Sequence, residues 1–175
     1  MILDRFRMTD RVAIVTGGSK GIGRGIARAF AEAGADLELA SRNPDALESA
    51  AAQMRSETGR RVLAVPCDVN EREHLERVVE RAWAEFGRID VLVNNAGGTP
   101  PRPALRTSEK MFEAAFHFNV TSAFLLSRLA IPKMLEGGGG TILNISSGMS
   151  RLVEKGFVAY GTAKAALVHM TRLLA

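Results

Sequence analysis

A tyrosine and a lysine stand four positions apart near the end of the sequence, at Tyr160 and Lys164. On a helix, residues with this spacing share a face, so the ammonium group can lie beside the phenol oxygen. A nearby cation favours the phenolate, which helps the phenol to give and take a proton near neutral pH. The spacing therefore predicts a proton-transfer pair. Taken alone, the pair is weak evidence, because a tyrosine and a lysine four residues apart are common on surface helices without a chemical role.

A glycine-rich segment, 16–23, follows an expected strand and opens an expected helix, with the spacing Gly-x-x-x-Gly-x-Gly. Glycines in this context permit a tight turn and a close approach of the backbone to a pyrophosphate, whose charge the helix N-terminus attracts. The alternative is an ordinary strand-to-helix turn. The residues predicted to contact a dinucleotide here are Thr16, Gly17, Ser19, Lys20, Gly21, Ile22 and Gly23.

The second expected strand ends in Ser41 and Arg42, where a site that prefers NAD would carry a carboxylate for the ribose 2′-hydroxyl. No acid is present at this point. Because a guanidinium group binds phosphate in a bidentate fork, Arg42, helped by Ser41 and Lys20, favours NADP(H), with NAD(H) still possible. The alternative for Arg42 is a plain surface arginine.

Two further segments follow expected strand ends. Asp68, next to Val69, is placed to accept a hydrogen bond from an adenine amino group, or else to serve as an acid at a helix N-terminus. Asn95, Ala96 and Gly97 end another strand beside the predicted cofactor, with Asn95 in a structural, cofactor-facing role.

Short runs rich in β-branched residues alternate with longer amphipathic stretches, a pattern typical of βαβ units around a parallel sheet. The apolar run at 12–15 predicts a strand that is buried on both faces. We therefore expect an α/β, doubly wound parallel sheet with a tail at 1–10 and one domain at 11–175. The expected strands are 11–16, 36–40, 61–66, 89–94 and 141–146, and the expected helices are 21–33, 44–58, 71–86, 108–136 and 158–175.

Composition excludes several classes of protein. The net charge of +4 comes from arginines spread among glutamates, without the clustered basic stripe of a nucleic-acid-binding protein. Cys67 is the only cysteine, and the three histidines lie far apart, so neither a disulfide nor a metal site is expected. No apolar run approaches the roughly 20 residues of a membrane span, and the start is too charged for a secretory signal. We expect a cytoplasmic protein.

Five motifs, at 16–23, 94–97, 119, 146–147 and 160–164, occur in an order and spacing that resemble the short-chain dehydrogenase/reductase family. The resemblance implies a Rossmann-type sheet, a nicotinamide dinucleotide, and hydride transfer between the nicotinamide C4 and a ketone or secondary alcohol. The segments 94–98 and 137–143 look somewhat like the hydroxysteroid dehydrogenase branch of this family.

The resemblance also implies the roles of the catalytic residues. Tyr160 looks like the general acid/base, and Lys164 like the residue that binds the nicotinamide ribose and acts on the tyrosine electrostatically. Ser147 matches the serine that orients the substrate oxygen, while Ser146 is expected to point to the opposite face in a supporting role. Asn119 resembles an asparagine whose local helix irregularity holds a water that links the lysine to solvent.

The chain also departs from the family pattern. Members usually run to about 250 residues with two further strands, whereas this chain reaches Ala175 within a helical pattern that has no stop signal. We expect a truncated chain whose strand at 141–146 is an exposed edge. The resemblance implies a dimer through the helices at 108–136 and 158–175, or a tetramer for a full-length chain. The alternatives are a noncatalytic dinucleotide-binding module or inactive fragment, and an interaction scaffold.

Overall fold

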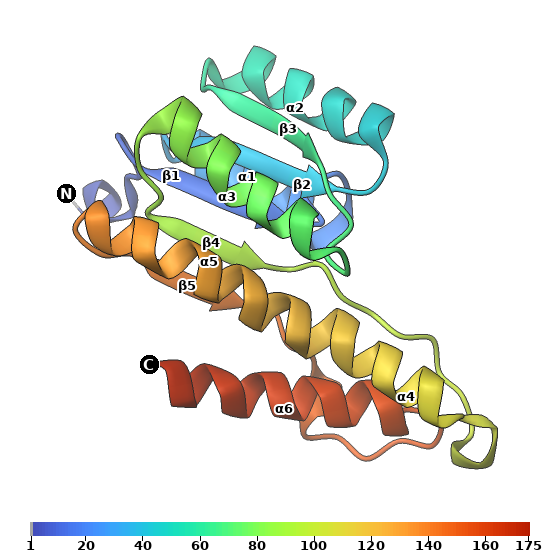
Figure 1. The fold of residues 1–175 in the computed structure, drawn as a ribbon. Coiled ribbons are helices and arrows are strands. Elements are labelled where there is room, and N and C mark those ends of the chain that lie inside the picture. The colour runs from blue at the N-terminus through green and yellow to red at the C-terminus, as the bar shows by residue number, and fades with distance from the viewer. Residues whose placement is uncertain (1) are drawn as a thin grey trace.

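Residues 2–175, which the computed structural model describes, form a five-stranded parallel sheet covered by helices (Figure 1). The strand order is β3-β2-β1-β4-β5, so the chain moves outward from β1 to β3, returns to β4 beside β1, and continues to β5. This reversal creates a switch point between β1 and β4. The strands are β1 (Val12–Thr16), β2 (Asp36–Ser41), β3 (Val62–Pro66), β4 (Val91–Asn94) and β5 (Thr141–Asn144).

Helices cover both faces of this sheet and create two hydrophobic cores. On one face, α1 (Gly21–Glu32) and α2 (Pro44–Thr58) bury alanine, leucine and methionine side chains against β1 and β2. On the other face, α3 (Arg72–Phe86) and α5 (Ser122–Glu136) pack together over β3 and β4. The sheet is therefore buried on both sides, which explains why β1 consists of five buried residues.

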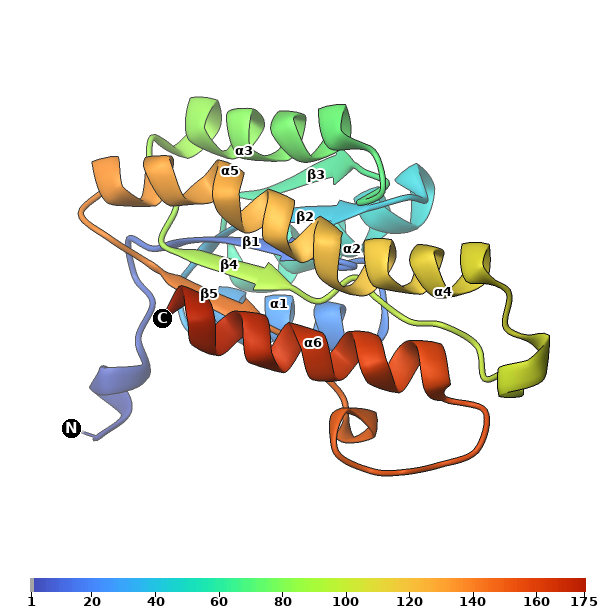
Figure 2. The ribbon, with the colours of Figure 1, turned by 60° about the horizontal axis from the view of Figure 1, so that its bottom comes forward.

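The long helical segment that contains α5 extends past the carboxyl ends of the strands, and the C-terminal helix runs beside β5 (Figure 2). A π-helical turn, η3 (His117–Thr121), joins α4 (Glu109–Phe116) to α5. α6 (Val158–Leu174) packs against α4 and η3 and runs beside β5. Three short 3₁₀ segments complete the described chain, namely η1 (Ile2–Phe6), η2 (Ala104–Arg106) and η4 (Gly148–Ser150).

Local sequence signals explain where α2 begins and ends. Pro44 occupies the first turn, where its missing N–H costs nothing, and the Asn43 side chain accepts a hydrogen bond from Ala46 N at 2.9 Å. The helix stops at Gly59, whose φ of 68° lies in the left-handed region that glycine adopts without strain.

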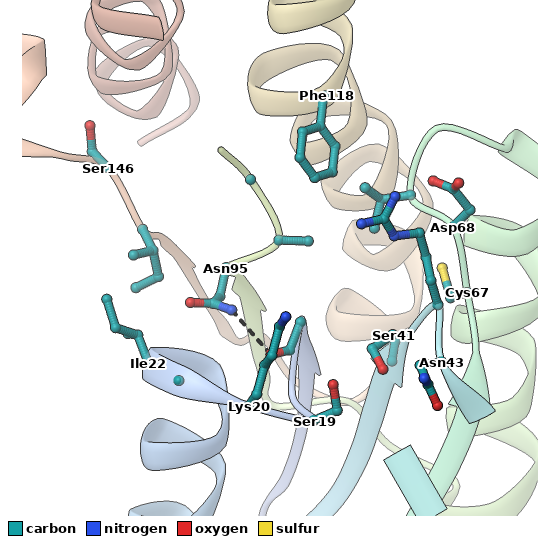
Figure 3. Close-up of a pocket in the computed structure, with 18 of the residues that line it drawn as sticks. Ser19, Lys20, Ile22, Ser41, Asn43, Cys67, Asp68, Asn95, Phe118 and Ser146 are labelled. Carbon is teal, nitrogen blue, oxygen red and sulfur yellow. Dashed lines mark hydrogen bonds between the residues drawn. The ribbon is translucent and has the colours of Figure 1, made fainter. Parts of the chain in front are cut away.

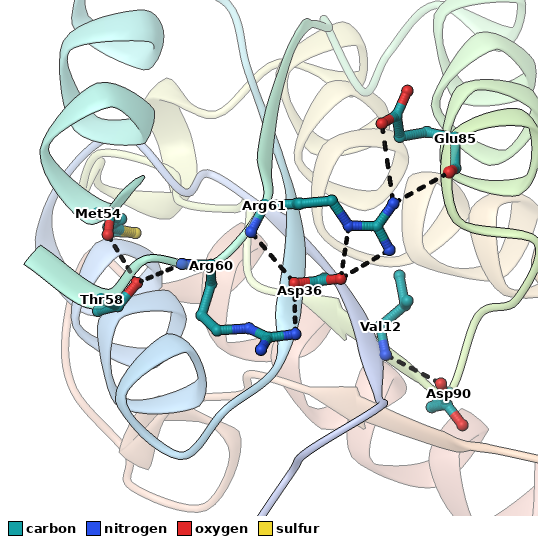
Figure 4. Close-up of polar contacts among 8 residues, drawn as sticks. All are labelled: Val12, Asp36, Met54, Thr58, Arg60, Arg61, Glu85 and Asp90. Carbon is teal, nitrogen blue, oxygen red and sulfur yellow. Dashed lines mark hydrogen bonds and ion pairs between the residues drawn. The ribbon is translucent and has the colours of Figure 1, made fainter. Parts of the chain in front are cut away.

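Two buried aspartates, Asp36 and Asp90, accept hydrogen bonds near the amino ends of the strands (Figure 4). Asp36 accepts hydrogen bonds from the Arg61 backbone N at 3.1 Å and from the Arg60 side chain at 2.7 Å. Asp90 accepts from Val12 N at 2.9 Å and from the side chains of Arg11 and Arg88. Burial by itself raises the pKa of Asp90, but these hydrogen bonds outweigh it and the pKa lies below its usual value. The opposite ends of the strands, which are their carboxyl ends, remain free for a site.

The predicted α/β fold is confirmed, with bounds that differ from the predictions by two residues at most except within the long helix. β4 begins at Val91 instead of 89, and β5 ends at Asn144 instead of 146. The helix expected over 108–136 is continuous, but η3 inserts a wider turn into it. Such π turns occur mostly as single insertions in α-helices, frequently at functional sites.

The helical segment Glu109–Glu136 is the one part of residues 2–175 that could cross a membrane by length and composition alone. The mean hydropathy of its 18-residue window is 1.2, and a single helix of this kind is weak evidence for a membrane span. In the fold, however, α5 packs on α3 and β4, and its inward face belongs to the core. Core helices of water-soluble proteins pass the same test.

Candidate active site

A cleft of about 530 Å³ opens at the carboxyl ends of the strands, above the switch point between β1 and β4. Open α/β sheets bind their ligands at this position. Figure 3 shows Cys67 and Asp68 at one end of the cleft and Ser146 at the other. Of the residues predicted to contact the dinucleotide, only Thr16 and Gly23 are absent from the described lining. The predicted residues that line the cleft are Gly17, Ser19, Lys20, Gly21, Ile22, Ser41, Arg42, Asp68, Val69, Asn95, Ala96, Gly97, Tyr160 and Lys164.

Thr16 and Gly23 lie behind this lining and hold its loops together. The Thr16 hydroxyl accepts hydrogen bonds from the backbone N of Asn95 and of Ala96, both at 3.0 Å, and donates to Val93 O. The Asn95 side chain donates back to Thr16 O at 2.8 Å. A Cβ at Gly23 would stand 2.4 Å from this Asn95 side chain, so only glycine fits there. The two residues therefore fix the glycine loop against the end of β4.

The first turn of α1 faces the cleft with its backbone donors available. Its N-cap, Lys20, makes no side-chain cap hydrogen bond, so the N–H groups that follow are free for an anion. A Cβ built on Gly21 would meet nothing within 4 Å, which shows that this turn borders open space. The predicted pyrophosphate site is therefore sterically accessible.

Basic and hydroxyl groups gather where β2 ends. Within residues 2–175, the buried Ser41 Oγ has no hydrogen-bond partner and the exposed Arg42 side chain has neither an ion pair nor a hydrogen bond. Asp68 is the one carboxylate in the described lining, and its Oδ1 also accepts from Asn70 N at 3.0 Å. Asp68 thus borders the cleft and shapes the turn before α3, and its expected contact with an adenine amino group stays a prediction.

The predicted proton-transfer pair lies together at the other end of the cleft. Lys164 is 4% exposed, and its Nζ donates to Ile145 O at 2.9 Å and lies 5.8 Å from the centre of the Tyr160 ring. Burial lowers the pKa of Lys164, since desolvation disfavours the ammonium form. Tyr160 is half-buried and borders the open space of the cleft.

Asn119 occupies the π turn and connects it to the loop after β4. Its side-chain amide donates to Ala115 O at 2.8 Å, and its Oδ1 accepts from Gly98 N at 2.9 Å. A Cβ at Gly97 would stand 2.9 Å from both Asn119 Oδ1 and Lys164 Nζ. The side chains of Asn119 and Lys164 therefore both approach Gly97. A larger residue than glycine at this position would collide with them.

The two serines lie differently from their expected positions. β5 ends at Asn144, so strand alternation does not decide where Ser146 and Ser147 point. Ser146 lines the cleft, and its hydroxyl donates to Lys164 O at 3.1 Å. The Ser147 hydroxyl instead accepts from Met149 N at 3.2 Å at the start of η4, and Ser147 is absent from the described lining.

Six lining residues were not among the predicted site residues: Ala40, Asn43, Cys67, Phe118, Ile145 and Ser146, the last of which was expected only in a supporting role. Cys67 and Ile145 directly follow β3 and β5, so the rule that ligands bind at carboxyl ends of strands could have indicated them. Phe118 lies in the π turn, and no sequence signal indicates that its ring reaches the cleft.

Comparisons with known proteins agree with this geometry. The profile described as short chain dehydrogenase matches residues 11–175. An uncharacterized oxidoreductase of Mycobacterium tuberculosis is 51% identical over 176 residues, covering 100% of this chain and 66% of that protein. The chain thus spans about two thirds of the length of this relative.

Two solved structures are similar as well. A 7α-hydroxysteroid dehydrogenase complexed with NADH and 7-oxo glycochenodeoxycholic acid superposes with a TM-score of 0.95 at 35% identity, covering 98% of this chain and 67% of that one. An L-sorbose reductase from Gluconobacter frateurii, complexed with NADPH and L-sorbose, gives 0.92 at 34% identity, covering 97% and 64%. With the profile match, the switch-point cleft and the Tyr160–Lys164 pair, the chain belongs to the short-chain dehydrogenase family of oxidoreductases.

Proposed function

We propose that this protein is an NADP(H)-dependent oxidoreductase that transfers a hydride between nicotinamide and a ketone or secondary alcohol. The observation that carries the proposal is the buried Lys164 beside Tyr160 at one end of a cleft whose other parts suit a dinucleotide. The two similar solved structures hold NADH and NADPH respectively, so relatives of this chain use both cofactors. The preference for NADP(H) comes from this chain's own residues.

The cleft residues fit a dinucleotide phosphate. The free N–H groups at the start of α1 suit a pyrophosphate, and Asp68 and Val69 border the space proposed for the adenine. Among the described residues, Ser41 Oγ is a buried hydroxyl without a hydrogen-bond partner, a costly state that a ligand oxygen would relieve. Together with Arg42 and Lys20 it offers two positive charges and a hydroxyl for a 2′-phosphate.

In this proposal the bound nicotinamide supplies the hydride chemistry, and the chain positions the substrate and moves a proton. Tyr160 donates its phenol proton to the carbonyl oxygen during reduction and takes it back during oxidation. Lys164 holds a positive charge near the phenol ring, which favours the phenolate that remains. Asn119 supports the lysine across Gly97, and Ser147 is proposed to orient the substrate oxygen, as family resemblance implies.

A second candidate, a noncatalytic dinucleotide-binding module, is favoured by one observation. Ser147 uses its hydroxyl to begin η4 and does not line the described cleft. Activity would require this hydroxyl to turn toward the substrate. A chain that bound NADPH but reduced no carbonyl compound would support this second candidate.

The proposal is tested first by thermal unfolding with and without NADPH and NADH. A ligand at 100 times its Kd that binds only the folded state adds about 2.7 kcal/mol of stability. For a domain of this size that corresponds to a rise in Tm of roughly 5–10 °C. We expect this rise with NADPH at a lower concentration than with NADH. A Tm that neither cofactor changes would contradict the dinucleotide site.

Two further aspects belong to the proposal. We expect a homo-oligomer, with α4, α5 and α6 as the contact, because Phe124 and Val158 remain exposed on these helices. Equilibrium sedimentation would test the assembly.

We also expect a cytoplasmic location without nucleic-acid or membrane partners, which cell fractionation would test.

A further inference from the structure

A second cavity, of about 610 Å³, adjoins the dinucleotide cleft and shares Tyr160 with it. Its walls come from the loop after β4, from α4 and η3, and from the start of α6. Small-molecule pockets have volumes of roughly 300–1,000 Å³, so this space is large enough for a ligand of its own. A molecule that fills it would meet the Tyr160 side chain at one end.

Much of the wall of this cavity is apolar. Pro100, Met111, Ala114, Ala115, Phe118 and Ala159 contribute hydrocarbon surface to it. Burying hydrocarbon against such a wall is favourable, at about 25 cal/mol per Å² of apolar surface. The cavity therefore suits a substrate with a hydrocarbon body along this wall.

The charged groups around the cavity all have the same sign. Its described lining contains the guanidinium groups of Arg42 and Arg102, but no carboxylate. Within residues 2–175, neither arginine side chain makes an ion pair or a hydrogen bond. The exposed Arg61, by contrast, is bound to Asp36. The cavity thus has uncompensated positive charge that an anion would neutralise.

Arg102 is held at a defined place relative to Tyr160. Its backbone N donates a hydrogen bond to Gly156 O at 2.7 Å, and Gly156 lies two residues before the start of α6. Gly156 has a φ of 88°, and a Cβ there would approach Pro101 and the Arg102 backbone at 3.6 Å. The loop that carries Arg102 is therefore anchored to the segment that leads into the Tyr160 helix.

Arg42 and Arg102 differ in what else they face. Arg42 lines both the dinucleotide cleft and the second cavity, whereas Arg102 lines the second cavity and not the cleft. If Arg42 is engaged by a 2′-phosphate, Arg102 is the cation that remains for a substrate.

We propose that the substrate carries an anionic group that Arg102 binds, with a hydrocarbon body along α4 and its carbonyl at Tyr160. This inference rests on the proposed oxidoreductase function and narrows its substrate class. A carboxylate and a phosphate monoester both provide the required oxygen anion, and a guanidinium group can bind either one bidentately.

The test compares the reduction of methyl-ketone carboxylic acids of increasing chain length with the reduction of their methyl esters. Each acid and ester pair differs in charge and shares its carbonyl. At the best chain length we expect kcat/KM to favour the acid about tenfold, the size of one charge-assisted contact. Arg102→Met should abolish this preference by raising KM for the acid.

Arg106→Met is the matched control, because Arg106 lies in the same loop, in η2, but outside the described cavity lining. It should keep the acid preference of the wild type. Competitive inhibition by inorganic phosphate but not by acetate would indicate a phosphate ester in place of a carboxylate. Equal use of acid and ester by the wild type, or an acid preference that survives in Arg102→Met, would overturn the inference.

Failure of the anion site can be distinguished from failure of the proposed oxidoreductase function. If NADPH raises Tm but no ketone is reduced, the oxidoreductase proposal fails, and the anion site is then judged by binding alone. The acid, with NADPH present, should raise the Tm of the wild type above the effect of its ester, and Arg102→Met should lose this difference. No difference in the wild type would overturn the anion site as well.

Discussion

Replacing Glu38 with glutamine is expected to stabilise the protein more and more as the pH rises. Glu38 lies in the middle of β2, paired with Ile14 on β1 and Leu63 on β3, and is 0% exposed. Among residues 2–175 neither of its carboxyl oxygens has a hydrogen-bond partner. Burial raises its pKa from 4.5 to about 9, while the positive charge of Arg81 acts in the opposite direction.

The sign and size of the effect follow from this pKa. In the folded state Glu38 keeps a proton that the unfolded chain releases above pH 4.5. The contribution of Glu38 to the free energy of unfolding is therefore most favourable below that pH and is lost as the pH approaches about 9. One pH unit in this window corresponds to about 1.36 kcal/mol. From about pH 5.5 to about pH 7.5, wild-type unfolding free energy should therefore fall by about 2.7 kcal/mol relative to Glu38→Gln.

Urea denaturation of the wild type and of Glu38→Gln across this pH range measures the difference in their free energies of unfolding. The titration of all other groups is common to the two proteins and cancels in this difference. Glu80→Gln is the control, since Glu80 is an exposed glutamate of α3, next to Arg81 in the sequence. Its difference from the wild type should stay near zero at every pH. A Glu38→Gln difference that is constant across the range would refute the reasoning, since it would mean that Glu38 titrates alike in both states.

Three further predictions follow from the cleft and the sheet edge. Arg42→Ala should weaken NADPH binding about tenfold, about 1.4 kcal/mol, and leave NADH binding unchanged in a fluorescence titration; equal weakening of both would contradict the 2′-phosphate role. Gly97→Ala should cost about 1–3 kcal/mol in urea denaturation, because its Cβ would crowd Asn119 and Lys164, and an unchanged stability would show that the space is not restricted. The 175-residue chain should self-associate as its concentration rises, because β5 pairs only with β4 among the described strands; a monomer at all concentrations in size-exclusion chromatography would disprove this.

The parts of the fold that depend on local pattern were predictable from the sequence. Hydrophobic runs and glycine punctuation indicated all five strands, and the ends of the expected strands indicated Ser19 and Asn95 as cofactor-site residues, to which the family resemblance added Tyr160. The structure places all three in the cleft lining. The wider turn around Asn119 was implied only by family resemblance, since a single extra residue in a helical turn leaves no clear periodic signal.

Features that depend on long-range packing were not predictable. Glu38 reads as an ordinary polar residue in a strand, and only the packing of α3 over β2 shows that it is fully buried. Arg102 lies in a loop whose conformation is held by Gly156, a contact between segments distant in sequence. Ser147 turns into the start of η4 because β5 ends earlier than its apolar pattern suggests.

The central claim is that Tyr160 moves the proton while the rest of the cleft binds the dinucleotide. It is tested most directly by measuring NADPH oxidation with a panel of ketones for the wild type and for Tyr160→Phe, alongside NADPH binding by both. We expect the variant to bind NADPH as tightly as the wild type and to lose turnover by at least about a hundredfold, as for loss of a general acid. Turnover that survives in Tyr160→Phe, with binding unchanged, would contradict this claim.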